Sequence, residues 1–187
     1  MLRNTVKEEY VIILDFLPNG HPFDTRPGHL KTPIAQALGK EHFVLLELVP
    51  KKGIFLQPLE EVYIGEGKRD NIHHIYGKID FNKLTETAKN ELNYVIGDLV
   101  KKNEAKFVEF FNKCGPISTR MHQIELIPGI GKKHMWVILE ARKEKEFESF
   151  EDIKNRVKLM SDPEKAVIKR ILSELKGEDR YKVFIER

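Results

Sequence analysis

Two glycines and two lysines lie close together in the middle of the chain, at Gly129, Gly131, Lys132 and Lys133. Glycine lets the backbone bend sharply and lets an anion approach main-chain amides without meeting a Cβ. Ile130, between the glycines, is expected to hold the bend against a core. If a helix begins at Lys132, its first amides and its dipole favour a phosphate, and the lysines add side-chain charge. The spacing therefore predicts a phosphate-binding bend.

Residues 118–144 around this bend resemble the helix-hairpin-helix family, which holds the backbone of DNA or RNA with little regard to sequence. The resemblance implies that the main-chain carbonyls of Glu125, Ile127 and Ile130 hold a monovalent cation, Na+ or K+, that bridges to a phosphate. Met135 departs from the family pattern, which usually has a small residue there for close contact between the two helices.

The bend needs helices on both sides, and the apolar spacing predicts them. Capping residues mark several starts: Thr85, Asn103, Ser118, and Ser149 with Asp152 three positions later. The predicted helices lie at residues 85–99, 103–111, 118–126 and 132–143, with a short one after Ser149 and a last one from 163 to 175. A final strand is predicted at 181–185.

The first 80 residues read instead as short strands separated by glycine- and proline-rich turns. The predicted strands lie at residues 10–14, 34–38, 42–49, 61–64 and 72–79. Five strands with no long helical period between them favour a small antiparallel barrel, OB-like in the first place and SH3-like as the alternative. The predicted fold is therefore α+β with two domains, an OB-like barrel at 1–80 and a helical domain at 81–187.

The last predicted strand of the barrel alternates, so His74, Tyr76 and Lys78 are expected to share one face. An aromatic ring between cationic groups can stack on a base and neutralise a phosphate. This face is a second candidate nucleic-acid-binding surface. The alternative is an ordinary solvent-exposed face of an antiparallel sheet.

The charge is unevenly distributed along the chain. The net charge is +3, and residues 81–187 carry 22 basic and 18 acidic side chains. A basic stretch runs through the predicted helices and suits an acidic polymer. Its members are Lys101, Lys102, Lys106, Lys113, Arg120, Lys132 and Lys133. We take Arg120, a member of this basic stretch, as a further candidate nucleic-acid contact.

Residues of the kinds that build catalytic or metal sites do not form a recognisable pattern. The single cysteine, Cys114, lies beside phenylalanines and is expected to be a buried structural thiol. His21, Asp24 and His29 share one loop, but their spacing is not diagnostic of a metal site. We therefore expect no catalytic residue and no enzyme activity. Because the chain shows neither a signal peptide nor an apolar run of membrane-spanning length, we expect a cytoplasmic protein without membrane contact.

Nearly the whole chain also resembles an archaeal family known only as a domain of unknown function and described as RNA-binding. The resemblance is carried by residues 84–85, 107–112, 116–117, 119–120, 126–133 and 149–153. It implies an OB-like barrel followed by a helix-hairpin-helix, RNA rather than DNA as partner, and a role near translation or ribosome maturation. The resulting hypothesis is a non-catalytic RNA-binding protein. The alternatives are a protein-interaction adaptor of the translation or transcription machinery and a DNA-binding protein.

Overall fold

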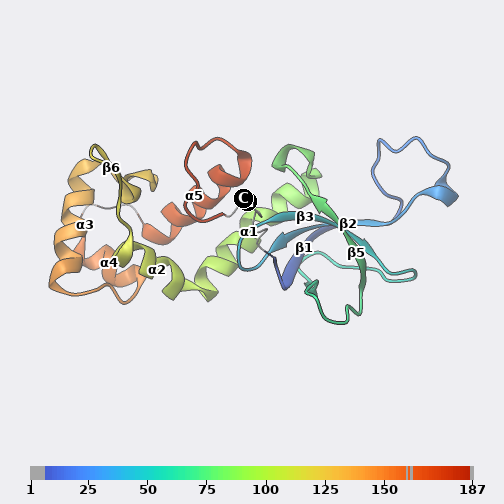
Figure 1. The fold of residues 1–187 in the computed structure, drawn as a ribbon, viewed down its shortest axis with the longest axis horizontal. Helices are drawn as coiled ribbons and strands as arrows, with labels where there is room; N and C mark the ends of the chain where they lie inside the picture. Colours follow the sequence, from blue (N-terminus) through green and yellow to red (C-terminus); the bar gives the residue numbers. More distant parts are fainter. Residues whose placement is uncertain (1–6, 159, 161, 186–187) are drawn as a thin grey trace, which may run out of the picture. The chain divides into compact units, whose positions relative to one another are not determined.

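The computed structural model describes residues 7–158, 160 and 162–185. The chain divides into two compact units, of which the second is Ile96–Glu174 and the first comprises the residues on either side. The first unit contains a β-sheet, and the second is mainly helical (Figure 1). The division falls inside a helix, so the domain boundary at residues 80–81 stays a prediction.

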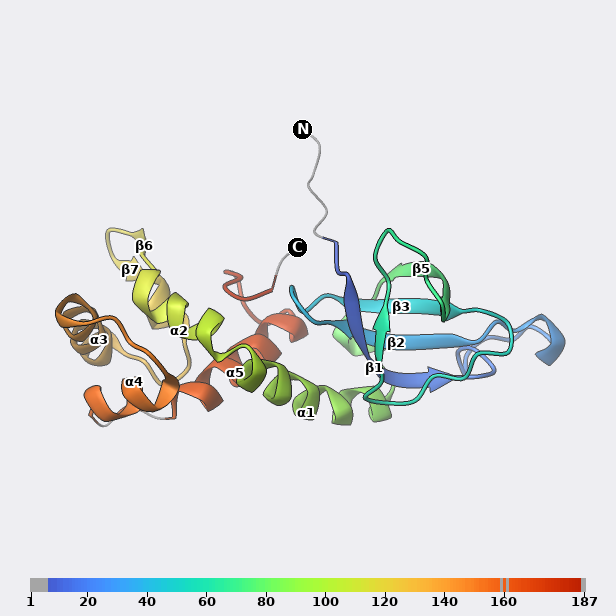
Figure 2. The same cartoon turned by 90° about the horizontal axis from the view of Figure 1, so that it is seen from below.

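Five antiparallel strands form the sheet of the first unit, in the order β4-β1-β2-β3-β5. Figure 2 shows β1, β2 and β3 side by side. The strands are β1 (Tyr10–Leu17), β2 (Ile34–Gly39), β3 (Leu45–Pro50), β4 (Glu61–Tyr63) and β5 (Ile72–Lys78). All five predicted strands are thus confirmed. Among the described residues no ladder joins β4 to β5, so the sheet is a curled half-barrel rather than a closed one.

Apolar side chains cover one face of this sheet with a continuous core. Ile13 pairs with Ala37, which pairs with Leu46, so these three side chains point to the same side. They belong to a buried cluster that also contains Ala35 and Leu48. Every residue of β3 is buried, which requires cover on both faces of the sheet. Burial of each large aliphatic side chain contributes about 1.5–3 kcal/mol.

Five α-helices follow within the described residues. They are α1 (Glu86–Lys102), α2 (Glu104–Lys113), α3 (Lys132–Glu144), α4 (Phe150–Arg156) and α5 (Pro163–Lys176). Thr85 and Ser149 cap α1 and α4 as predicted, because their hydroxyl oxygens accept the amides of Ala88 and Asp152. Asn103 precedes α2 but does not cap it. Its side-chain amide donates to the Leu99 carbonyl instead.

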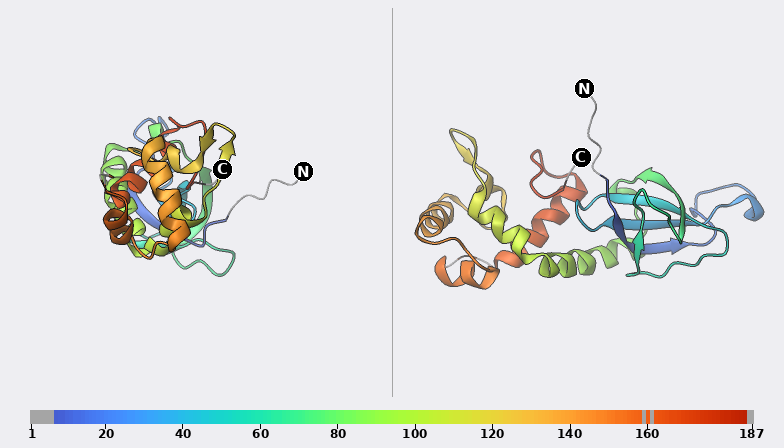
Figure 3. Two further views of the ribbon diagram at one scale, coloured as in Figure 1. Left: turned by 90° about the vertical axis from the view of Figure 1, so that its left-hand side faces the viewer. Right: turned by 60° about the horizontal axis from the view of Figure 1, so that its bottom comes forward.

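Two predicted elements are wrong. The segment 118–126 is not an α-helix. It contains a small hairpin, β6 (Pro116–Ser118) and β7 (Met121–His122), and then the 3-10 helix η3 (Gln123–Leu126). The hairpin appears with α2 and α3 in Figure 3. Residues 181–185 form bends rather than a strand. A β-strand needs a neighbouring strand to pair with, and alternating apolar residues do not by themselves supply one.

Candidate functional site

The glycine-containing bend connects η3 to α3. Gly129 has φ +84°, a left-handed conformation that favours glycine, and it is exposed. Ile130 is buried, as predicted, and its amide donates to the Ile127 carbonyl at 3.1 Å. The bend is therefore closed by one internal hydrogen bond and held down by one apolar side chain, while its glycines face solvent.

The first turn of α3 lies open beside the bend. Gly131 is the N-cap residue, with extended backbone and no side-chain hydrogen bond to the helix start. The first amide to close a helical bond is that of Met135, which donates to the Gly131 carbonyl at 2.9 Å. The amides before it have no carbonyl partner within the helix. Gly131, Lys132 and Lys133 are exposed, and within the described chain neither lysine forms an ion pair. This end of α3 thus carries positive charge and unpaired donors.

The residue order before Pro128 explains why no α-helix enters the bend. The residue preceding a proline is driven out of the α region, and Ile127 has φ −78° and ψ 125°. The helix can therefore extend no further than Leu126. At its start, the His122 side chain accepts the Ile124 amide at 3.2 Å, and the Glu125 carboxylate accepts the His122 amide at 2.9 Å. These reciprocal bonds form a capping box around a single short turn.

A buried ion pair holds the end of this turn to α5. The Arg170 Nη1 donates to the Leu126 carbonyl at 2.9 Å, and its Nε donates to Glu174 at 2.7 Å. Arg170 is 5% exposed and Glu174 1%. A buried charge without a partner is energetically costly, so Arg170 and Glu174 stabilise the end of this turn only when both are present. The bend is therefore positioned by a charged side chain from 44 residues further along the chain.

A second arginine connects α3 to the end of α2. Arg142 donates to the carbonyls of Phe111 and Cys114, at 3.0 and 2.9 Å. Cys114 is buried, as predicted, and burial raises the pKa of its thiol against the opposing influence of Arg142. Met135, the position that departs from the helix-hairpin-helix pattern, is buried as well. The core thus accommodates the Met135 side chain at a position where the helix-hairpin-helix family usually has a small residue.

The capping role of His122 predicts pH-dependent stability. Burial and the nearby charge of Arg142 lower the pKa of His122 from 6.5, against the opposing effect of Glu125. Below pH 6.5 the unfolded chain takes up a proton more readily than the folded one, so stability falls as pH drops through the lowered pKa. We expect the melting temperature to decrease over this range, and less so in His122→Asn, whose side chain caps without titrating. An identical pH dependence in the two proteins would contradict this assignment.

The other candidate residues of the second unit are less closely constrained. Arg120 lies exposed in the turn between β6 and β7, where its amide donates to Ser118 Oγ. Of the three carbonyls expected to hold Na+ or K+, that of Ile127 already accepts the Ile130 amide and keeps one free lone pair. The cation site at Glu125, Ile127 and Ile130 remains a prediction.

The structure separates the three candidate residues on β5. Leu48 pairs with Ile75 and Glu47 with Gly77, so Tyr76 is an extra residue at a β-bulge. The bulge reverses the alternation, and Lys78, paired with Leu46, lies on the face of the sheet core. The prediction that Lys78 shares a face with His74 and Tyr76 is therefore wrong. Two cavities lie beside β5. Of the three candidate residues, His74 and Tyr76 line the larger cavity, whereas Lys78 lines the smaller one.

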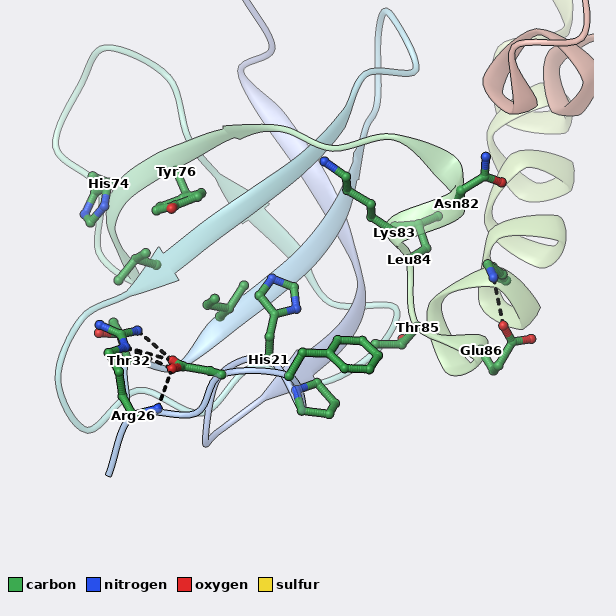
Figure 4. Close-up of a pocket in the computed structure, with 16 residues that line it drawn as sticks. His21, Arg26, Thr32, His74, Tyr76, Asn82, Lys83, Leu84, Thr85 and Glu86 are labelled. Atoms are coloured by element: carbon green, nitrogen blue, oxygen red, sulfur yellow. Dashed lines mark hydrogen bonds and ion pairs between the residues drawn. The ribbon is translucent and has the colours of Figure 1, made fainter. Parts of the chain in front are cut away.

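The larger cavity belongs to the first unit and has a volume of about 1000 Å³. Figure 4 shows the side chains that line it. They come from the loop after β1, from β5, from the segment leading into α1 and from the first residues of α1 itself. Among them are His21, Phe23, Asp24, Arg26, His74, Tyr76, Lys83, Thr85 and Lys89. Sequence reasoning did not identify Phe23 or Lys83 as site residues, because only the fold brings the two segments together.

Among the described residues, no group of three or more histidine, cysteine or acidic side chains is placed to hold a metal ion. His21 contacts Glu47, and Asp24 is bound by Arg26, so the loop histidine and carboxylate have protein partners.

Within the residues that the structure describes, no helix has the length and apolar character needed to span a membrane.

Comparison with known proteins gives matches over nearly the whole chain. The family model described as "Protein of unknown function (DUF655)" matches residues 7–186. The uncharacterized protein MJ0038 of Methanocaldococcus jannaschii is 45% identical over 181 residues, 96% of this chain and 80% of that protein. The crystal structure of Af1531 from Archaeoglobus fulgidus is similar with a TM-score of 0.86 and 48% identity, covering 96% of this chain and 100% of that one.

Proposed function

Because the chain belongs to the DUF655 family, whose function is unknown, we propose its function from the geometry of its exposed sites. The protein is a non-catalytic nucleic-acid-binding protein. It holds the phosphate backbone through Gly129, Ile130, Gly131, Lys132 and Lys133, as a helix-hairpin-helix does, with help from the OB-like sheet. RNA as the partner, and a place near translation or ribosome maturation, rest on the family resemblance alone.

One observation carries the proposal, the uncapped start of α3. Gly131 contributes no side chain to the amides of the first turn, and among the described residues no side-chain hydrogen bond caps the start of the helix. The helix dipole places partial positive charge there, and a phosphate supplies oxygens that accept from such amides. The exposed side chains of Lys132 and Lys133 add two full charges beside them. A ligand with an anionic oxygen satisfies all these groups together.

Salt dependence tests the proposal. Each phosphate contact releases counterions, so the logarithm of the binding constant falls with the logarithm of the salt concentration in proportion to the number of contacts. Replacing both Lys132 and Lys133 with alanine is expected to reduce that slope by about 2 for an RNA duplex. The measurement is fluorescence anisotropy over a series of salt concentrations.

The matched control replaces Lys165 and Lys169 with alanine. These lysines are exposed on α5, in the same unit, and their removal changes the net charge equally. We expect a smaller change in slope for the control than for the bend variant. Equal slopes in the wild type and in the bend variant would remove the bend from the interface.

The single tryptophan of the chain offers a local readout. Trp136 is 59% exposed on α3, four residues after Lys132 and therefore on the same side of the helix. Binding at the bend is expected to change its fluorescence, and binding elsewhere is not.

The exposed apolar pair Trp136 and Val137 also favours the alternative function, an adaptor that docks a protein partner. In that case the binding of purified RNA leaves the emission of Trp136 unchanged.

A further inference from the structure

Both walls of the larger cavity in the first unit contact one row of polar residues on the sheet. Asp15 pairs in register with Gln36, and Gln36 pairs with Glu47, so these side chains point to one side of the sheet. Gln36 is fully buried, accepts the Thr85 amide at 2.9 Å and donates to the Lys83 carbonyl at 3.2 Å. The sheet therefore holds the segment that forms one wall of the cavity.

The opposite wall is the loop after β1, whose His21 lies against the same row of polar residues. His21 Nε2 lies 2.7 Å from Oε1 of Glu47, a carboxylate that is 7% exposed. Within this loop, Arg26 donates to both carboxylate oxygens of Asp24 at 2.7–3.0 Å. Contacts within the protein therefore position both walls, which lowers the entropic cost of binding.

The cavity offers aromatic surface to a ligand. Tyr76 is 70% exposed and Phe23 91% exposed, although both line the cavity. In Figure 4 the Tyr76 ring lies on the β5 side, near His74, and His21 stands between that side and the α1 side. Aromatic rings that remain accessible inside a concavity suit a flat ligand, because base–aromatic stacking is favourable and tolerant of sequence.

The charges around the cavity favour an anion. Its two carboxylates are neutralised by neighbours, Asp24 by Arg26 and Glu86 by Lys89 at 2.8 Å. The hydrogen bond from Arg26 lowers the pKa of Asp24 to about 2. Lys83 is exposed and, within the described chain, has no acidic partner. Its side chain extends toward the β5 side in Figure 4. The balance of charge is therefore positive.

We propose that this cavity receives one unpaired nucleotide of the bound nucleic acid, with its base against Tyr76 and its phosphate beside Lys83. The inference rests on the proposed function and deepens it, because it specifies the strand state of the partner. A paired base cannot leave its duplex to enter a cavity without loss of pairing, so the site selects single-stranded or bulged segments. The bend before α3 makes no such distinction. A cavity of about 1000 Å³ accommodates a base, its sugar and one phosphate.

Two substitutions test the cavity, each with a matched control. Tyr76→Ala is compared with Tyr94→Ala, which removes a 64% exposed tyrosine from α1 outside the cavity. Lys83→Ala is compared with Lys52→Ala, which removes an exposed lysine from the turn after β3. The probes are a single-stranded oligoadenylate, an RNA duplex of the same length, and adenosine monophosphate. Binding is measured by calorimetry at fixed salt, and circular dichroism confirms folding of each variant.

We expect Tyr76→Ala to weaken binding of the single strand about tenfold and to leave binding of the duplex unchanged. Lys83→Ala is expected to reduce the salt slope for the single strand by about 1. Equal single-strand affinities of the Tyr76→Ala and Tyr94→Ala proteins would overturn the inference. So would adenosine monophosphate that binds as tightly as the single strand, since the occupant would then be a free nucleotide.

The outcomes also separate this inference from the proposed function. If the Lys132 and Lys133 variant loses duplex binding while Tyr76→Ala changes nothing, the bend is the interface and the cavity is not. If Tyr76→Ala loses the single strand while the lysine variant binds as the wild type does, the cavity stands and the proposed role of the bend fails.

Discussion

Replacement of Arg170 by alanine is expected to destabilise the protein by about 3–5 kcal/mol, the largest effect of any substitution considered. The change removes the buried ion pair between Arg170 and Glu174 and the hydrogen bond from Arg170 to the Leu126 carbonyl. Glu174 is 1% exposed, so solvent does not compensate for the loss of the ion pair. Chemical denaturation of the wild type and of the variant measures the difference.

Two further variants separate the ion pair from a general effect of substitution on α5. Lys169→Ala removes the exposed neighbouring charge and is expected to change stability by less than about 0.5 kcal/mol. The double variant Arg170→Met with Glu174→Leu replaces the pair with apolar side chains of similar volume and is expected to recover most of the stability. A wild-type denaturation midpoint for Arg170→Ala would contradict the role assigned to the pair.

The second large effect is expected at Thr85, which joins the sheet to the start of α1. Its hydroxyl donates to the Asp15 carboxylate at 2.6 Å and accepts the Ala88 amide at 3.1 Å. Thr85→Val keeps the shape and removes both bonds. Loss of a helix cap and of a hydrogen bond to a charged group adds up to about 2–4 kcal/mol. Thermal unfolding followed by circular dichroism reports the change.

Thr85→Ser is the matched control, since it keeps the hydroxyl and loses only a methyl group. We expect it to remain within about 1 kcal/mol of the wild type. Because Thr85 lines the cavity, Thr85→Val is also expected to weaken binding of a single-stranded oligoadenylate. Equal stability of the valine and serine variants would show that the hydroxyl contributes nothing.

Local sequence signals were sufficient where the structure depends on neighbouring residues. Thr85 and Ser149 cap helices because a hydroxyl reaches an amide three positions later, a distance set by the helix itself. The five strands of the sheet follow from runs of β-branched and large apolar residues between turn residues. The burial of Ile130 and the left-handed φ of Gly129 follow from an apolar side chain placed between glycines.

Local signals failed where a distant partner decides the outcome. The spacing of Met121, Ile124 and Leu126 suits an α-helix, but the chain forms a hairpin and a 3-10 turn stabilised by His122, Pro128 and Arg170. On β5 the alternation was interrupted by one bulged residue, which moved Lys78 to the other face. A shift of one residue in pairing is invisible in a single strand, because it is defined by the partner strand.

The amino-acid sequence alone therefore determined the five strands of the sheet, the helices α1 to α5, the caps at Thr85 and Ser149, and the bend with lysines before α3, since each depends on residues a few positions apart. The tertiary structure alone decided which residues share the cavity and how the bend is held. Tyr76, Lys83 and His21 meet there because Gln36 and Glu47 pair across the sheet and hold two distant segments. Such contacts depend on strand register and on burial of charge, which only the folded chain establishes.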